Sequence, residues 1–278
     1  MTCRSFGGQT LRVPADPCGG QHRSRSREAR ISIALGWTAI APTASLAALG
    51  GALGLPAGTA MRAEVARLSV RAGEPDETCC RSCAAPMPPA IALRCGHCGH
   101  WFGPPFVIEL ATAAVLALVF ARLGNQPDVL AFTYLGILGV ALALIDLAVQ
   151  RLPDRLTLPA YPALIAILAA LAAAEGDGTA FARALLGGLA LSACFLALGL
   201  LSAGQLGGGD IKLSCLLGLA SGWLGWYPLV AGACLGFLLA AGASLVLLTR
   251  RKVTRHTMIS FGPYLLGGTL LAILAAGH

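Results

Sequence analysis

The stretch "LSAGQLGGGDIKLSC", residues 201–215, places three consecutive glycines and an aspartate between two apolar runs, at 180–203 and 211–225. Glycine is a poor residue for a helix interior. Aspartate is costly inside a lipid bilayer and usually faces a polar cavity there. The stretch therefore predicts a break between two membrane-spanning helices, with a carboxylate at the beginning of the second helix.

Composition extends this pattern to most of the chain. Of the 278 residues, 56% are hydrophobic and 12% are charged, and the mean hydropathy is +0.73. Soluble proteins carry roughly 25% charged residues. Because about 20 apolar residues span a bilayer as a helix, we expect an all-α polytopic membrane protein of about eight helices, with six to eight allowed. The apolar segments lie at about 32–58, 105–123, 128–148, 157–174, 180–203, 211–225, 227–249 and 260–277.

Lysine and arginine gather in alternate loops, and such loops usually face the cytoplasm. One set of connections holds Arg62, Arg67, Arg71, Arg81, Arg94, Arg151, Arg155, Lys212, Arg250, Arg251, Lys252 and Arg255. The other set holds only Arg122 and Arg183, both near helix ends. We therefore expect the first set at the cytoplasmic face. We attribute the net charge of +7 to these cytoplasmic loops. We expect no nucleic-acid partner, because no basic face is interleaved with aromatic residues.

The chain divides into four parts by composition. Residues 1–31 form a basic tail without apolar periodicity, which predicts disorder. Residues 32–58 form the first transmembrane segment, residues 59–104 a cytoplasmic cysteine-rich insert, and residues 105–278 the membrane core.

The insert contains two C-x-x-C pairs within "CCRSCAAPMPPAIALRCGHCGHWFGPP", residues 79–105. Four thiolates suffice for tetrahedral zinc, and two close C-x-x-C pairs are typical of a structural metal site. Such a site would fold a segment that is too small to build its own core. The predicted ligands are Cys80, Cys83, Cys95 and Cys98.

Two carboxylates lie at matching depth in different helices. Asp146 stands near the cytoplasmic end of the third apolar segment, and Asp210 begins the sixth. Close carboxylates share a proton, so that one can act as a base on water while the other polarises a carbonyl group. The residue pattern alone fits an aspartic protease and a proton-coupled transporter equally well. A helix-capping role for Asp210 also stays open at this point.

Six motifs, in order along residues 45–277, resemble those of the type IV prepilin peptidases, membrane aspartic proteases with a G-x-G-D motif. The first is a helix that runs into a basic exit, and the second is the pair of cysteine knuckles. The motifs read "LGGALGLPAGTAMRAEVARL" (49–68), the two C-x-x-C pairs, "GPPFVIELATA" (103–113), "IDLAVQRLPDRLTLP" (145–159), "GQLGGGDIKL" (204–213) and "ISFGPYL" (259–265).

The resemblance implies that Asp146 and Asp210 are the catalytic pair, with Asp154 as a secondary candidate for the first role. It implies an active-site loop at Gly207, Gly208 and Gly209, with Lys212 in a positioning or charge-balancing role. Supporting positions are Glu109, Phe261, Gly262 and Pro263.

The implied reaction is cleavage of the short basic leader from type IV prepilins or pseudopilins, after a glycine, at the cytoplasmic face of a bacterial inner membrane. Many members also methylate the new N-terminus with S-adenosylmethionine. The link between the two cysteine pairs is shorter here than that activity leads us to expect. The expected partners are the prepilin substrates and the bilayer, and homodimer formation is left open.

Two other functions compete with the protease. A transporter that uses the same carboxylates would be expected to contain an internal repeat, and no convincing repeat is found. A cysteine-rich membrane scaffold would keep its function after substitution of both aspartates. It would lose that function after substitution of the cysteines.

Overall fold

The computed structural model describes residues 21–69, 79–80, 82–86, 94–101, 106–201, 207–250 and 260–276. The chain forms two compact units, residues 1–42 and residues 43–278. The second unit contains the predicted insert and core. Of the predicted disordered tail, residues 1–20 lie outside the described residues, and the first helix begins at Gln21.

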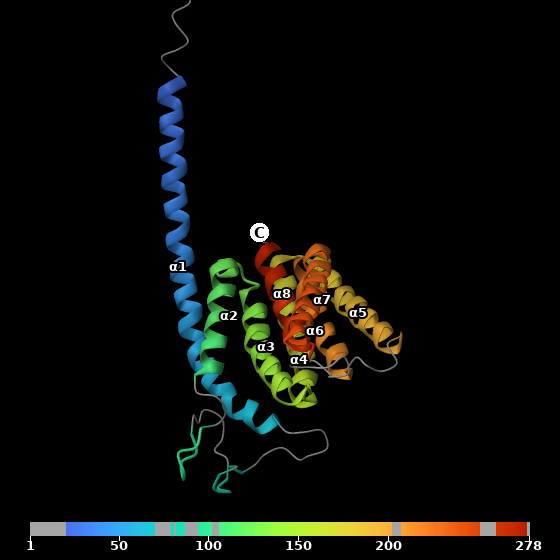
Figure 1. Ribbon diagram of the computed structural model, residues 1–278. Helices are drawn as coiled ribbons and strands as arrows, with labels where there is room; N and C mark the ends of the chain where they lie inside the picture. The colour runs from blue at the N-terminus through green and yellow to red at the C-terminus, as the bar shows by residue number, and fades with distance from the viewer. Residues whose placement is uncertain are drawn as a thin grey trace, which may run out of the picture. The chain divides into compact units, whose positions relative to one another are not determined.

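The described chain is all-α, as predicted, and carries eight helices (Figure 1). Every helix overlaps one of the eight apolar segments of the sequence. Five of the helices are long and apolar enough to cross a membrane, which fits a multi-pass membrane protein. The helices are α1 (Gln21–Leu68), α2 (Val107–Leu123), α3 (Val129–Val149), α4 (Asp154–Glu175), α5 (Gly178–Leu201), α6 (Gly208–Leu224), α7 (Trp226–Thr249) and α8 (Gly262–Ala276).

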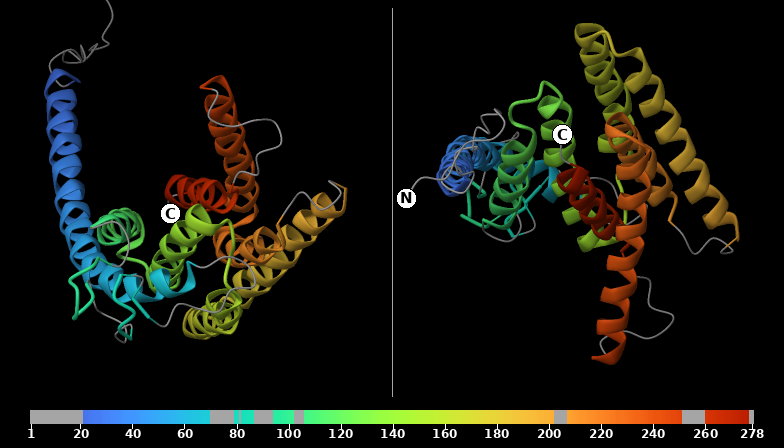
Figure 2. Two further views of the ribbon diagram at one scale, coloured as in Figure 1. Left: turned by 60° about the horizontal axis from the view of Figure 1, so that its bottom comes forward. Right: turned by 90° about the horizontal axis from the view of Figure 1, so that it is seen from above.

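Helices that are distant in sequence pack together within the second unit. The helix α3 lies between α2 and α8, and α6 contacts α3, α4, α5, α7 and α8 (Figure 1). The helices α4 and α5 are antiparallel neighbours joined by a short turn at Gly176 (Figure 2). These contacts bring the end of α3 and the beginnings of α4, α6 and α8 to one end of the bundle.

Glycines allow three helix pairs to approach closely. A Cβ atom added at Gly218 of α6 would lie 2.5 Å from the carbonyl oxygen of Gly187 in α5. A Cβ atom at Gly58 of α1 would lie 2.7 Å from the Cα atom of Glu109 in α2. The third such pair is α7 with α8, where Gly268 faces the backbone of Gly236. Small residues at helix contacts are typical of membrane proteins, because packing replaces the hydrophobic effect between helices in lipid.

The opposite end of the bundle carries two arginines that cap helices. Arg122 Nε donates to the carbonyl oxygen of Leu274 at 2.8 Å, near the end of α8. Arg183 donates to the carbonyl oxygens of Gly222 and Trp223, at 2.9 and 2.6 Å, near the end of α6. A cation at a helix C-terminus satisfies free carbonyl groups and complements the helix dipole. These contacts account for the two arginines outside the basic set of loops.

Candidate active site and metal centre

The beginning of α8 is held in place by an aromatic cluster. The ring of Phe261 lies 5.8 Å from that of Phe195 in α5 and 5.0 Å from that of Phe237 in α7, between centroids. Pro263 is the second residue of α8. Backbone N–H groups in the first turn have no partner within the helix, so the N–H that proline lacks costs no hydrogen bond there. The Phe-Gly-Pro motif thus anchors the first turn of α8 and leaves the backbone N–H of Gly262 free to bind a partner.

That partner is Asp146, which lies in the last turn of α3 and is buried, with 5% exposure. Its Oδ2 atom accepts a hydrogen bond from the backbone N–H of Gly262 at 3.1 Å. The same atom accepts a hydrogen bond from Ser260 Oγ. A Cβ atom at Gly262 would lie 2.6 Å from this oxygen. Glycine is therefore required here to admit the carboxylate.

Asp210 lies in the first turn of α6 and is half-buried. It lies near the end of α3 that carries Asp146, because α6 contacts α3. The side chain of Leu213, one turn later in α6, borders Gly262. The ends of α3, α6 and α8 thus bring together the two aspartates that the sequence placed at matching depth.

The glycine run before Asp210 presents an open surface rather than an unusual backbone. Gly207 is extended, with φ −67° and ψ 138°, and Gly208 begins α6. Gly207 and Gly208 are exposed, and a Cβ atom added at Gly208 would contact nothing within 4 Å. Gly209 packs against the side chain of Leu152. Because these glycines lack side chains, they leave open space beside Asp210. They do not adopt left-handed backbone angles.

Asp154 and Lys212 form an ion pair at the edge of this site. The Lys212 Nζ atom lies 2.5 Å from Asp154 Oδ1, and the two side chains are 40% and 57% exposed. The hydroxyl of Tyr161 donates to the carbonyl oxygen of Lys212 at 2.7 Å. Asp154 begins α4 and Tyr161 lies within it, so both contacts tie α4 to the first turn of α6.

Glu109 forms a second ion pair, which is buried. One of its carboxylate oxygens accepts a hydrogen bond from Arg62 Nε at 2.8 Å, and the other accepts one from Arg62 Nη2. The side chain of Arg62 is 0% exposed and that of Glu109 6%. The pair joins α1 to the first turn of α2. The arginine also faces the ring of Trp101, whose centroid is 5.9 Å from its Cζ atom.

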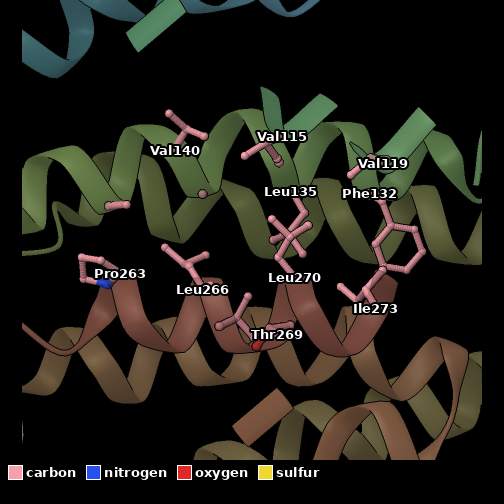
Figure 3. A pocket seen from close by; sticks show the side chains of 15 residues that line it. Val115, Val119, Phe132, Leu135, Val140, Pro263, Leu266, Thr269, Leu270 and Ile273 are labelled. Carbon is pink, nitrogen blue, oxygen red and sulfur yellow. The ribbon is translucent and has the colours of Figure 1, made fainter. Parts of the chain in front are cut away.

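An apolar cavity of about 200 Å³ lies between α2, α3 and α8. Leu135 and Val140 of α3 face Leu266 and Leu270 of α8 across it (Figure 3). Its lining includes a residue of α3, Ala143, and one of α8, Pro263, near the contact of Asp146 with Gly262. The cavity therefore adjoins the aspartate site on the apolar side.

The four predicted cysteine ligands lie together. Their sulfur atoms are all within 4.8 Å of one another. Cys80 Sγ lies 3.7 Å from Cys98 Sγ, and Cys83 Sγ lies 3.5 Å from Cys95 Sγ. A tetrahedral zinc ion with Zn–S bonds near 2.3 Å would hold sulfur atoms about 3.8 Å apart. The cluster therefore has the donor set and the spacing to hold a metal ion such as zinc.

Two matching turns present these cysteines. In the first, the backbone N–H of Cys80 donates to Ala85 at 2.8 Å; in the second, that of Cys95 donates to His100 at 2.8 Å. Ala84 and Gly99 occupy equivalent positions, with φ of 55° and 70°. The repeated geometry identifies each C-x-x-C pair as one knuckle of a shared site.

The electrostatics of the cluster favour a bound cation. Backbone N–H groups of Cys98 and His97 lower the pKa of the Cys95 thiol from 9.0 to about 6. For Cys83, the backbone contact with Ala85 lowers the pKa, but partial loss of solvation and the neighbouring sulfur atoms raise it to about 12. Cys83 and Cys95 therefore resist ionising together unless a cation neutralises them.

Sequence reasoning missed three residues around the site. Arg62 falls in the basic stretch after the first apolar segment, and no local pattern distinguishes it from the other arginines there. Ser260 directly precedes the Phe-Gly-Pro motif, and that position was the available signal. Tyr161 lies between two prolines in α4, and no local pattern connected it with Lys212.

These features define a class of protein: a multi-pass α-helical membrane protein with two aspartates from separate helices meeting at one end of the bundle. The family model described as "Type IV leader peptidase family" matches residues 132–249, which include both aspartates. Residues 132–249 therefore belong to the type IV leader peptidase family, and the resemblance seen in the motifs is confirmed.

Known relatives extend the similarity beyond that region. A prepilin leader peptidase/N-methyltransferase of Aeromonas hydrophila is 33% identical over 197 residues, which cover 70% of this chain and 61% of the relative. The protein of the same description from Pseudomonas aeruginosa is 33% identical over 190 residues, covering 66% of this chain and 63% of the relative. The chain thus spans about three fifths of the length of these curated relatives. No solved structure matches the chain.

Proposed function

We propose that this protein is a membrane aspartic endopeptidase that removes the short basic leader from type IV prepilins or pseudopilins. The observation that carries the proposal is the meeting of Asp146 and Asp210 from α3 and α6. Within the described residues, neither carboxylate forms an ion pair with a cation. Two acidic groups held together without a counter-ion suit proton transfer to and from a bound water.

The proposed reaction needs one carboxylate and one carboxylic acid. The carboxylate takes a proton from water as the water oxygen attacks the scissile carbonyl carbon. The acid donates its proton to the carbonyl oxygen. When the tetrahedral intermediate collapses, the C–N bond breaks, the amine nitrogen takes the first proton, and the second returns to the acid. Both groups regain their starting states, so no further reactant is required.

The surroundings of the aspartates support a membrane-bound peptide as the substrate. The open surface at Gly207 and Gly208 lets an extended backbone approach Asp210. The apolar cavity between α2, α3 and α8 lies beside Asp146 and suits apolar side chains. The basic loops at this end of the bundle support a site at the cytoplasmic face of a bacterial inner membrane. We also propose that the cut follows a glycine residue of the prepilin.

The test is incubation of the purified full-length protein with a prepilin in detergent micelles, followed by mass spectrometry. We expect a product that has lost its leader after a glycine. The relatives are also named as N-methyltransferases. If this protein shares that activity, adding S-adenosylmethionine should increase the product mass by one methyl group on the new N-terminus. Intact prepilin at every enzyme concentration, together with proton-driven solute uptake in liposomes, would support the transporter instead.

For the cysteine cluster, we propose a structural zinc ion held by Cys80, Cys83, Cys95 and Cys98. Four thiolates leave no open coordination position, so the ion would stabilise the insert without acting in catalysis. Elemental analysis of the purified protein should find one zinc per chain. Cys95→Ser should lose it, whereas Cys194→Ser, in α5 outside the insert, should retain it. Equal zinc content in both variants would contradict this assignment.

A further inference from the structure

We propose that Ser260 is a positioning residue that, together with the first turn of α8, holds Asp146 as the ionised member of the aspartate pair. This inference rests on the proposed function, and it assigns a separate role to each aspartate. Asp146 becomes the base that activates water. Asp210 becomes the acid that protonates the scissile carbonyl oxygen.

Two donors meet on one oxygen of Asp146. The hydroxyl of Ser260 and the backbone N–H of Gly262 both donate to Oδ2. Hydrogen bonds donated to a carboxylate favour its charged form, and they are stronger than bonds between neutral groups. With Oδ2 engaged twice, the second oxygen of the carboxylate is left to take the proton from water.

Asp146 lies in the last turn of α3, but its carboxylate meets the N-terminus of α8, which adds to this preference. Gly262 is the first residue of α8, and its N–H is one of the four that lack a partner within the helix. The positive end of the helix dipole stabilises an anion there. The aromatic contacts of Phe261 with Phe195 and Phe237 fix this end of the helix. The anion site is therefore rigid before any substrate arrives.

Asp210 has a different environment. It lies in the first turn of α6, where the helix dipole also favours an anion, and the backbone of Gly207 lies beside its Oδ2 atom, but no described side chain donates a hydrogen bond to it. It also lies near Asp146, because α6 contacts α3. Because two close carboxylates do not both ionise easily, the proton of the pair belongs on the group with fewer donors. That group is Asp210.

The chain contains a matched arrangement away from the site. Asp177, in the turn before α5, accepts hydrogen bonds from Thr179 Oγ1 at 2.6 Å and from the backbone N–H of Ala180 at 2.9 Å. It has the same kinds of donor, a hydroxyl and a helix N-terminus, but its side chain caps its own helix. Thr179→Ala therefore serves as the control for Ser260→Ala.

The kinetic experiment compares Ser260→Ala, Ser260→Thr and Thr179→Ala with the wild type in prepilin cleavage. Ser260→Ala should lower kcat roughly 10- to 100-fold with KM unchanged, the range that corresponds to loss of one hydrogen bond to a charged group. Ser260→Thr keeps a hydroxyl and should recover most of this loss. Thr179→Ala should cleave at the wild-type rate. Wild-type kcat in Ser260→Ala, or equal losses in the alanine and threonine variants, would overturn the inference.

A spectroscopic experiment tests the protonation states without cleavage. Infrared difference spectra of the full-length protein at neutral pH should contain the band of one protonated carboxyl group. The band should be lost in Asp210→Asn and should keep its frequency in Ser260→Ala, because Ser260 donates to Asp146 and not to Asp210. A shift of the band in Ser260→Ala would overturn the inference even if the wild type cleaves prepilin. If the wild type cleaves nothing but the bands behave as stated, the proposed function fails and the assignment of the proton stands.

Discussion

Four carboxylates lie at the same end of the bundle, and they fall into two kinds. Glu109 and Asp154 each face a cation, Arg62 and Lys212 respectively. Asp146 and Asp210 lie near each other at the contact of α3 with α6, and within the described residues no lysine or arginine pairs with either. Burial does not separate the two kinds, since both Glu109 and Asp146 are buried.

We infer from this difference that Glu109 and Asp154 are structural acids. A carboxylate with an arginine or lysine partner holds two elements together, here α1 with α2 and α4 with α6. A carboxylate within a membrane protein that lacks a cationic partner is expensive to keep and is usually retained for function. The presence or absence of a counter-ion, rather than burial, therefore distinguishes the two kinds of acid.

The largest effect is expected from the unpaired aspartates. Asp146→Asn and Asp210→Asn should each reduce prepilin cleavage by about 100- to 10,000-fold, because each removes a group that transfers a proton in the proposed reaction. Neither should lower the thermal midpoint, since neither breaks an ion pair. Cleavage rates and melting curves in the same detergent test both points. Substantial cleavage by either variant would remove that aspartate from the active site.

The buried ion pair should give the largest effect on stability. Glu109→Gln leaves the charge of Arg62 buried without a full partner, and loss of one member of a buried pair costs about 3–5 kcal/mol. Replacing both residues by methionine should recover most of that loss, because no charge then remains buried. Denaturant unfolding in mixed micelles measures all three proteins. A double variant as unstable as Glu109→Gln would show that the pair contributes more than charge neutralisation.

The sequence predicted the helices well because membrane spans are long, apolar and bounded by polar breaks. The polar gap between the apolar segments 157–174 and 180–203 is the turn between α4 and α5, and the glycine run is the beginning of α6. Spacing also predicted the cysteine cluster, since each C-x-x-C pair forms a local turn. Features that depend on one short segment can therefore be predicted from the sequence alone.

The partners of the acids were not readable in this way. Arg62 and Glu109 are 47 residues apart in sequence, Asp154 and Lys212 58 apart, and Ser260 and Asp146 114 apart. Such contacts depend on how whole helices pack, and no local pattern carries that information. This is why Asp154 stayed a rival to Asp146 at the level of the sequence: both are acids in one motif, and only their neighbours differ.

A substitution at Gly208 tests whether the substrate backbone lies in the open space beside Asp210. Gly208→Ala adds one methyl group into open space at the first residue of α6, so the free protein should fold normally. Cleavage should fall roughly 10- to 100-fold in kcat/KM, as expected when a reacting bond is displaced by about an ångström. Gly178→Ala is the matched control, because Gly178 begins α5 and is equally open. Equal activity of the two variants would place the substrate backbone elsewhere.

The exposed ion pair should give a smaller effect. Asp154→Asn and Lys212→Ala remove a pair whose side chains are 40–57% exposed, and such pairs contribute about 0–1 kcal/mol. We expect a small decrease in unfolding free energy and cleavage within a few-fold of the wild type. A loss of cleavage in Asp154→Asn as large as that in Asp146→Asn would instead make Asp154 the first catalytic acid.

The smallest effect concerns Asp177, which shares its kinds of donor with Asp146 but lies at the surface of the opposite end. The hydroxyl of Thr179 and the backbone N–H of Ala180 lower the pKa of Asp177 below its usual range. Its contribution to stability is therefore complete above the pKa of an unfolded-state aspartate and is lost as the pH falls through the lower folded-state pKa. Asparagine caps a helix without this charge. Thermal midpoints recorded from neutral to acidic pH should thus fall less steeply for Asp177→Asn than for the wild type, and parallel curves would show that the cap does not depend on charge.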